Sequence, residues 1–265
     1  MMMDRRTVFS LVFALSVALS AGYGARVWAV ENGSVLELVN GETDGVLESL
    51  PAPTLEAYAA PSDTEADIDP WEGWNEPVFR LNKKFDEYVL KPVAIGWDRA
   101  LPDSFQRGLH NAIDNLAVVR RVMNNLFQGK PERAGRELMR FTINSTIGYV
   151  GFLDVAKDYF GIQQADEDFG QTLAVWGAKS GPYLVLPLRP ASTVRDTTGD
   201  VIDWIMYPLT WAVPWGASFG LWAVDGVNER SLNLDRYQRV EESVVDLYSA
   251  VRNAYFQRRA AAIRE

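Results

Sequence analysis

The chain has 265 residues, 48% of them apolar, and its 35 acidic and 26 basic side chains give a formal charge of −9. That length accommodates one or two domains with a substantial core. The lack of Cys excludes disulfides, thiolate metal sites and Cys nucleophiles, and a single His excludes sites that need two imidazoles. The acidic balance argues against a nucleic-acid partner, so we expect no metal, no cofactor and no nucleic acid.

Residues 1–29 have the features of a signal peptide. Arg5 and Arg6 precede a charge-free run, rich in Leu, Val and Ala, that extends to residue 21. Small residues at 27 and 29 form an A-x-A-like cleavage site, and residues 18–20 offer a second one. The run is short for a bilayer-spanning helix, which needs about 20 residues, although an uncleaved anchor stays an alternative.

The next segment predicts a disordered acidic linker over residues 30–68. Between residues 30 and 69 there are ten acidic residues, several Pro and Gly, and no Lys or Arg. Such a composition buries too little apolar area to offset the entropy cost of ordering. The rest of the chain holds 23 basic and 24 acidic residues and is nearly neutral. We therefore expect one folded domain over residues 69–265.

Within this domain, apolar residues recur every three or four positions, which is the period of an α-helix. The pattern and its Pro and Gly boundaries predict these elements: a helix that has Pro77 in its first turn and is interrupted at Pro92, a helix from Pro102 to Gly129, a helix from Pro131 to about Ser145, a short helix over 169–176, a strand or small hairpin over 181–188, and a helix over 235–263. The fold class is therefore all-α.

The segment from Val201 to Val224 does not have the composition of a soluble protein. Seventeen of its 24 residues are apolar, and Asp203 is its only charged residue. The segment is long enough to cross a bilayer, but its Pro and Gly residues predict breaks. Two interpretations stay open, a buried pair of helices and a bent element lying in a membrane. In the second, four tryptophans are the embedding candidates: Trp204, Trp211, Trp215 and Trp222.

Three motifs resemble enzyme sites but lack the context that catalysis needs. Residues 216–220 match G-x-S-x-G, yet no strand pattern precedes them and the only His, His110, lies upstream. His110 and Asp114 are four residues apart on one helix, which favours a structural contact. The acidic residues 166–168 suit a hard cation, but more often such a cluster caps a helix. We therefore predict that the protein is not an enzyme.

Blocks of sequence across residues 69–260 resemble the MlaA/VacJ family of outer-membrane lipoproteins. The blocks come in family order and at family-like spacing, and they include Asp69-Pro70-Trp71-Glu72-Gly73-Trp74-Asn75, Lys91-Pro92-Val93-Ala94, Arg140-Phe141, Asp154-Val155-Ala156, Phe169-Gly170-Gln171-Thr172-Leu173, Gly181-Pro182-Tyr183, Arg195-Asp196, Gly199-Asp200 and Ala254-Tyr255-Phe256-Gln257-Arg258-Arg259.

The resemblance implies a compact, ring-like bundle of amphipathic helices, partly embedded in the inner leaflet of the outer membrane. It implies a channel that lets misplaced phospholipid leave the outer leaflet and passes it to a periplasmic carrier protein of the Mla pathway. Phospholipids, this carrier and a trimeric outer-membrane porin are the expected partners.

A lipid path must be apolar for acyl chains yet offer hydrogen bonds to the headgroup, because an unmatched buried polar group costs a few kcal/mol, on the order of 2–7. The candidates for such a path are Asn75, Asn82, Asn144, Ser145, Thr172, Tyr183 and Arg195. Arg195 suits a bidentate contact with phosphate, and pairing with Asp196 or Asp200 is its alternative role.

One departure from the family is the missing lipobox Cys, so no acyl anchor can form on it. We expect the apolar body, or an unprocessed N-terminal helix, to hold the protein at the periplasmic face of the outer membrane. The alternative is a soluble periplasmic scaffold that binds a partner through its Trp-rich surface.

Overall fold

The computed structural model of the chain describes residues 69–264, so the predicted signal peptide and acidic linker lie outside it. Helices make up most of the described part, with a single two-stranded sheet, as the all-α prediction requires. The elements in chain order are α2 (Glu72–Phe85), η3 (Asp86–Leu90), α3 (Lys91–Ala100), α4 (Asp103–Asn115), α5 (Val118–Phe127), α6 (Pro131–Thr146), α7 (Val155–Asp158), α8 (Phe169–Val175), β1 (Tyr183–Val185), β2 (Ala191–Thr193), α9 (Val194–Met206), α10 (Leu209–Ala212), α11 (Trp215–Leu232), α12 (Leu234–Ser243) and α13 (Leu247–Arg264).

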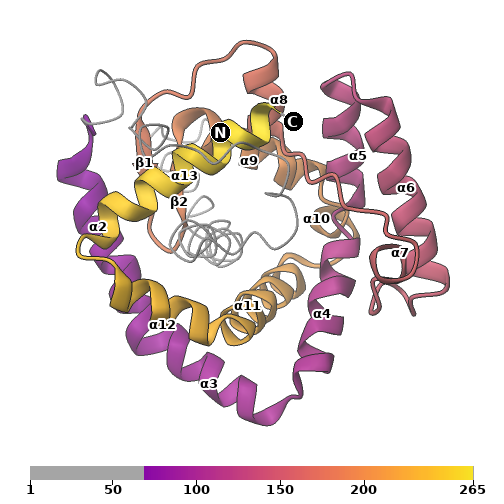
Figure 1. The fold of residues 1–265 in the computed structure, drawn as a ribbon, viewed down its shortest axis with the longest axis horizontal. Coiled ribbons are helices and arrows are strands. Elements are labelled where there is room, and N and C mark those ends of the chain that lie inside the picture. The colour runs from indigo at the N-terminus through magenta and orange to yellow at the C-terminus, as the bar shows by residue number, and fades with distance from the viewer. Residues whose placement is uncertain (1–68, 265) are drawn as a thin grey trace, which may run out of the picture.

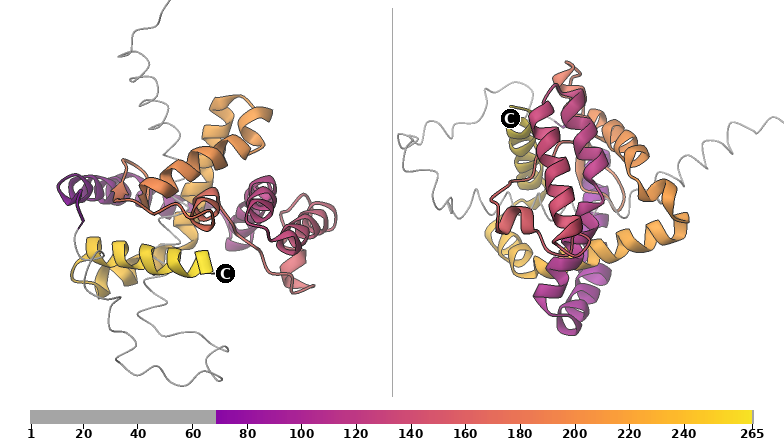
Figure 2. Two further views of the ribbon diagram at one scale, coloured as in Figure 1. Left: turned by 90° about the horizontal axis from the view of Figure 1, so that it is seen from above. Right: turned by 90° about the vertical axis from the view of Figure 1, so that its right-hand side faces the viewer.

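The helices form a ring, which confirms the expected architecture (Figure 1). Helices α2, α3 and α4 follow one another along its edge, the pair α5 and α6 forms one side, and α8, α9 and the antiparallel hairpin β1–β2 complete it. Helix α11 packs against α3 and α4. Seen from above, α10 and the start of α11 project from one face of the ring, whereas α12 and α13 cover the other (Figure 2).

The first helix continues past both of its prolines, whereas the sequence predicted Pro77 in its first turn and an interruption at Pro92. Helix α2 begins at Glu72, so Pro77 lies in its second turn. Near Pro92 the backbone widens into the π-helical turn η3, in which Lys91 N–H donates to the carbonyl of Asp86, five residues back. Proline has no N–H to donate, and a change of hydrogen-bond register just before it keeps the chain helical.

Two of the predicted long helices are each divided in two. The helix expected from Pro102 to Gly129 breaks at Leu116 and Ala117 into α4 and α5. The helix expected over 235–263 breaks at residues 244–246 into α12 and α13, because the Asp246 carboxylate accepts hydrogen bonds from the backbone N–H groups of Tyr248 and Ser249. A side chain that satisfies free N–H groups in this way starts a new helix.

An apolar core lies where the hairpin, α2 and α13 meet. It contains Val78 and Phe79 of α2, Tyr183, Val185 and Ala191 of the hairpin, and Tyr248, Val251 and Tyr255 of α13. Beside it, α8 and α9 approach so closely that a Cβ at Gly199 would lie 2.3 Å from the backbone nitrogen of Gly170. Only glycine permits two helical backbones to come this near.

A loop after α6 holds consecutive residues in the left-handed region of the backbone. Tyr149 has a φ of 53° and Val150 a φ of 61°, and Gly151 follows with a φ of 89°. The loop is fixed in place because Gly151 N–H donates to the Asn144 carbonyl at 2.7 Å and Leu153 N–H donates to the Gly148 carbonyl at 2.9 Å. Left-handed geometry is rare for a β-branched residue, and it points both large side chains outward.

The close approach of α8 and α9 predicts that Gly199→Ala destabilises the ring. The new methyl group would collide with backbone atoms that cannot rotate away, so we expect a loss of about 1–3 kcal/mol in the free energy of unfolding. Chemical denaturation in mild detergent, followed by circular dichroism, measures it. Gly135→Ala on α6 is the matched control, because a Cβ there meets nothing within 4 Å and alanine raises helix stability by about 1 kcal/mol. Equal effects of the two variants would contradict the role given to Gly199.

Candidate functional site

Three helices on one side of the ring bury many polar side chains and expose many large apolar ones. In a water-soluble protein such helices do the opposite. On α4, α5 and α6 the buried polar residues are Gln106, Asn115, Arg121, Asn124, Asn125, Glu137, Arg140 and Asn144, whereas Phe105, Val119, Leu126, Phe127, Leu138, Met139 and Phe141 are exposed. This arrangement gives the ring a polar interior and an outer surface rich in apolar side chains.

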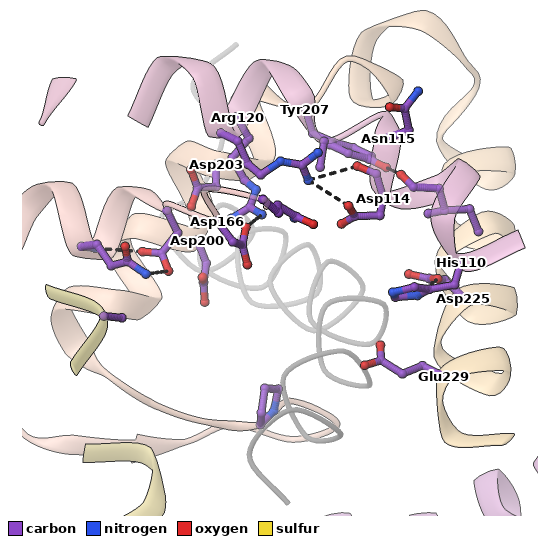
Figure 3. Close-up of a pocket in the computed structure, with 18 of the residues that line it drawn as sticks. His110, Asp114, Asn115, Arg120, Asp166, Asp200, Asp203, Tyr207, Asp225 and Glu229 are labelled. Atoms are coloured by element: carbon purple, nitrogen blue, oxygen red, sulfur yellow. Dashed lines mark hydrogen bonds and ion pairs between the residues drawn. The ribbon is translucent and has the colours of Figure 1, made fainter. Parts of the chain in front are cut away.

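A cavity of about 630 Å³ lies inside the ring. Its wall is shared by α4, α5, α6, α9, α11, α13 and the segment between α7 and α8. Figure 3 shows carboxylates, amides and guanidinium groups pointing into it from several of these elements, and Trp222 and Ala262 add apolar surface. The cavity therefore offers both hydrogen bonds and apolar contacts.

Two carboxyl groups on α9 have strongly raised pKa values. Burial raises the pKa of Asp203 to about 7, with a further contribution from the charge of Asp168, although Arg120 and two hydrogen bonds oppose the change. Those hydrogen bonds come from Asn124 Nδ2 at 2.7 Å and Phe169 N–H at 2.9 Å. Burial likewise raises the pKa of Asp200 to about 6, despite its ion pair with Arg189.

Arg259 of α13 joins α8 to α9 through two carboxylates. Its guanidinium donates to Asp168, which caps the N-terminus of α8, and it also contacts Asp196 at 2.9 Å. Burial disfavours the ionised form of Asp168, but Arg259 outweighs burial and lowers the pKa of this carboxyl to about 2. The pKa of Asp196 is lowered for the same reason, against the effect of its burial. These charges stabilise the wall of the cavity.

The polar faces of the other helices are also joined by buried ion pairs. Arg121 of α5 donates to Glu137 of α6 at 2.5 Å, and the second oxygen of Glu137 accepts a hydrogen bond from Ala165 N–H. Arg230 of α11 makes a bidentate contact with Asp86 of η3, with N–O distances of 2.7 and 3.0 Å. The charges of these helices are therefore partnered, as burial of charge requires.

Two of the predicted path residues, Asn75 and Asn82, attach the hairpin segment to α2. Asn75 Nδ2 donates to the Tyr183 carbonyl and its Oδ1 accepts from Val185 N–H. Asn82 bonds in the same way to the carbonyls of Leu186 and Arg189 and to Leu188 N–H. The two amides are seven residues apart on one face of α2. Their hydrogen bonds to the backbone of the hairpin segment replace those that a neighbouring β-strand would make.

The structure does not gather the seven predicted path residues in one place. Asn144 lines the cavity, where it donates to Asp154 and accepts from Ala156 N–H. Ser145 accepts a hydrogen bond from Asn115, Thr172 donates to Asn124, and Tyr183 packs in the core. Arg195 pairs with Asp196 at 2.8 Å, which is the alternative role that the sequence left open.

The four tryptophans occupy different environments along the bent segment from α9 to α11. Trp211 lies in α10 and Trp215 is the first residue of α11, so both belong to the projecting bend, and they are 74% and 82% exposed. Trp204 is half-buried, and Trp222 is buried and lines the cavity. None of the helices between residues 69 and 264 has both the length and the hydropathy needed to cross a bilayer. The predicted bend is present, and its tip carries two of the four candidates.

The residues of the motifs that resemble enzyme sites lie in helices and contact neighbouring helices. Residues 216–220 lie in the first turns of α11, after Pro214 and α10 rather than after a strand. His110 Nδ1 is 3.6 Å from Asp225 Oδ1 on α11, while Asp114 accepts from Arg121. In the described part of the chain no group of three or more His, Cys, Asp or Glu side chains is placed to hold a metal ion.

The acidic run 166–168 is divided among separate partners, as the helix-cap interpretation predicts for Asp168. Asp166 pairs with Arg120, Glu167 with Lys130 and Arg133, and Asp168 caps α8.

Sequence reasoning missed the inward carboxylates of α9, and it missed Arg259, which pairs with one of them, Asp196. A signal was available, because Asp203 is the only charge in an apolar run of 24 residues and so needs a buried partner. For Asp200 and Arg259 the sequence offers no comparable contrast, since both stand among other charged or polar residues.

The comparisons with known proteins agree on one family. The family model described as MlaA lipoprotein matches residues 67–262. The "Intermembrane phospholipid transport system lipoprotein MlaA" of Escherichia coli K12 is 35% identical over 200 residues, which cover 74% of this chain and 79% of that protein. The relative of the same name in Haemophilus influenzae is 34% identical over 195 residues, 71% of this chain and 76% of that protein.

One solved structure has a similar fold. It belongs to work titled "Structural basis for maintenance of bacterial outer membrane lipid asymmetry", and it matches with a TM-score of 0.65 and 33% sequence identity. The match covers 74% of this chain and 99% of that one.

The raised pKa of Asp203 predicts that the ring loses stability as the pH rises. The folded state holds the proton up to about pH 7, whereas the unfolded carboxyl loses it near its ordinary pKa of 3.8. The folded protein therefore binds more protons between these values, and its free energy of unfolding falls as the pH rises through this window. Asp203→Asn removes this titration. We expect the thermal midpoint of the wild type to fall more steeply between pH 5 and 8 than that of the variant, and identical slopes would contradict the assignment.

Proposed function

Because this chain belongs to the MlaA lipoprotein family, we propose that it removes mislocalised phospholipid from the outer leaflet of the outer membrane. In this proposal the ring lies in the inner leaflet, phospholipid passes through its interior, and a periplasmic carrier of the Mla pathway receives it. The names of the relatives, which refer to intermembrane phospholipid transport, support this role.

The observation that carries the proposal is the inverted arrangement of the helices. Burial of Glu137, Arg140 and Asn144 on α6, next to the exposed Leu138 and Met139, is unfavourable in water. In hydrocarbon the same arrangement is favourable, because the apolar side chains contact acyl chains and Glu137, Arg140 and Asn144 each form hydrogen bonds inside the ring. An outer surface of this kind fits a protein embedded among lipids.

The cavity fits a phospholipid in the same way. Trp222 and neighbouring apolar atoms suit acyl chains, whereas the amides and charged groups of α4, α6 and α9 suit a headgroup. Transport of this kind requires binding and release rather than bond cleavage, so the role we propose is not enzymatic. A trimeric porin is the outer-membrane partner that we propose, by resemblance to the family.

The projecting bend adds a means of fixing the depth of the ring. Trp211 and Trp215 are exposed at its tip, and indole rings prefer the interface between headgroups and hydrocarbon. Such a bend holds a protein at a membrane by inserting at the interface. The exposed apolar residues of α4, α5 and α6 form an outer belt around this side of the ring. We propose that the bend and this outer belt together retain the protein in the outer membrane.

A charge placed on the outer belt distinguishes a membrane-embedded channel from a soluble scaffold. Leu138 on α6 is 52% exposed, and lysine at such a position costs up to about 2.5–3.5 kcal/mol in hydrocarbon but almost nothing in water. We expect Leu138→Lys to move protein from the outer-membrane fraction to the soluble fraction, while Asn253→Lys on the exposed surface of α13 leaves the distribution unchanged. A scaffold in the periplasm would tolerate both changes equally.

The transport role itself is tested in cells that lack the gene. We expect more phospholipid on the cell surface and greater detergent sensitivity, both restored by the wild-type gene and not by the Leu138→Lys gene. Normal surface lipid in the deletion strain would contradict the proposed function.

A further inference from the structure

The two faces of the ring differ in chemistry. The projecting bend, which comprises the end of α9, α10 and the start of α11 (residues 204–220), extends from one face, whereas α12 and α13 cover the other (Figure 2). No charged residue occurs between Asp203 and Asp225. The exposed side chains described for the bend are all apolar: Ile205, Trp211, Ala212, Pro214, Trp215, Ala217 and Phe219. The bend therefore presents an uncharged surface on one side of the ring.

The opposite face carries charged and polar side chains. Those exposed on α12 and α13 include Arg236, Gln238, Arg239, Glu242, Asn253, Gln257 and Arg264. A charged side chain at the centre of a bilayer costs about 2.5–3.5 kcal/mol, so this face is suited to water. Of the two faces, the one with the projecting bend is suited to hydrocarbon.

Polar groups of the bend are bonded within the protein. Thr210 Oγ1 and Trp211 Nε1 each donate to the carbonyl six residues earlier, at 2.9 and 2.7 Å. In water an indole that is 74% exposed needs no such acceptor, because water supplies one. The chain leaves α9 at Pro208 and enters α11 after Pro214, and proline has no N–H to leave unpaired at these breaks. Hydrocarbon imposes this requirement, since polar groups there find partners only within the protein.

Helix α11 connects the bend to the cavity. It begins at Trp215, and its Trp222, Asp225 and Glu229 line the cavity. From Trp215 to Trp222 an α-helix rises about 10 Å, whereas the hydrocarbon of one leaflet is about 15 Å thick, half of the bilayer core. The bend is thus long enough to reach through most of one leaflet.

We infer that the projecting bend inserts into the hydrocarbon of the outer leaflet, and that the face covered by α12 and α13 lies toward the periplasm. The inference rests on the proposed function, which places the ring in the inner leaflet. With the ring there, the bend extends into the opposite leaflet, and Trp211 and Trp215 at its tip approach the headgroups of that leaflet. The reverse orientation would place the charges of α12 in hydrocarbon and the apolar bend in water.

This orientation identifies the side on which outer-leaflet lipid meets the ring. The bend contacts that lipid, and α11 runs from the bend to the wall of the cavity, where Trp222 lies. Helix α11 then forms a continuous surface between the acyl chains of the outer leaflet and the interior of the ring.

The test measures the depth of three sites in the full chain, reconstituted in vesicles of phosphatidylethanolamine and phosphatidylglycerol. The chain contains no Cys, so one introduced Cys carries a single nitroxide label. Ala217→Cys reports on the bend, Leu138→Cys on the outer belt, and Gln238→Cys on α12 is the matched control, because all three positions are exposed. Electron paramagnetic resonance gives the accessibility of each label to oxygen, which concentrates in hydrocarbon, and to a water-soluble nickel chelate.

We expect the chelate to reach the label at residue 217 at least about tenfold less than the label at residue 238, which corresponds to a difference of about 1.4 kcal/mol. The label at residue 217 should be at least as well shielded as the one at residue 138, because the bend extends from the ring toward the opposite leaflet. Oxygen should reach both of these labels readily. Circular dichroism of each variant verifies that its helices are intact.

The contrary results separate this inference from the proposed function. If the chelate reaches residue 217 as it reaches residue 238 while residue 138 stays shielded, the bend does not insert, although the ring is embedded. If residue 238 is shielded and residue 217 is accessible, the ring has the reverse orientation and the inference fails. If all three labels are accessible to the chelate, the embedding on which the proposed function depends fails together with the inference.

Discussion

Buried ion pairs join the helices of this ring to one another at several points. Arg121 with Glu137 joins α5 to α6, Asp86 with Arg230 joins η3 to α11, and Arg259 joins α13 to α8 and α9. Buried pairs of this kind add little net stability, but loss of one partner leaves an uncompensated charge that costs about 3–5 kcal/mol. The apolar side chains that would otherwise build a core are consequently free to face outward. The polar cavity and the apolar outer belt both follow from this arrangement, in which polar side chains face inward and apolar side chains face outward.

Much of the fold was open to prediction, because an amphipathic helix has the same apolar periodicity whether its apolar side faces inward or outward. A stripe of apolar residues repeats every three or four positions whether it faces a core or a membrane, so α6 and α8 were found nearly to the residue. Periodicity does not say which way the stripe points. The breaks were harder. Asp246 starts α13 through its side chain, and the π-helical turn before Pro92 keeps a helix intact where proline normally ends one. Neither the Asp246 cap nor the π-helical turn alters the spacing of apolar residues, so periodicity could not predict them.

The candidate site was predicted only in part, for a related reason. Asn75, Asn82 and Asn144 were chosen as uncharged polar residues among apolar neighbours, and all three are buried, as that contrast implies. Only tertiary structure distinguishes an amide that binds a hairpin, as Asn75 does, from one that lines a cavity, as Asn144 does. Pairings such as Arg259 with Asp168, 91 residues apart, have no local signal. The family resemblance predicted the ring, whereas the contacts of its individual residues depend on tertiary structure.

The left-handed loop after α6 links the fold to its surroundings. Tyr149 and Val150 adopt backbone angles that cost on the order of 1–3 kcal/mol each, and they are 76% and 73% exposed. Exposure of these side chains to water does not offset that strain. Covering them with hydrocarbon stabilises the loop by about 25 cal/mol for each Å² of apolar surface removed from water. The native geometry of this loop thus depends on the medium. In the proposed membrane position, lipid that covers these two side chains stabilises the loop, so a detergent with a poorly matched tail should relax this loop before it unfolds any helix.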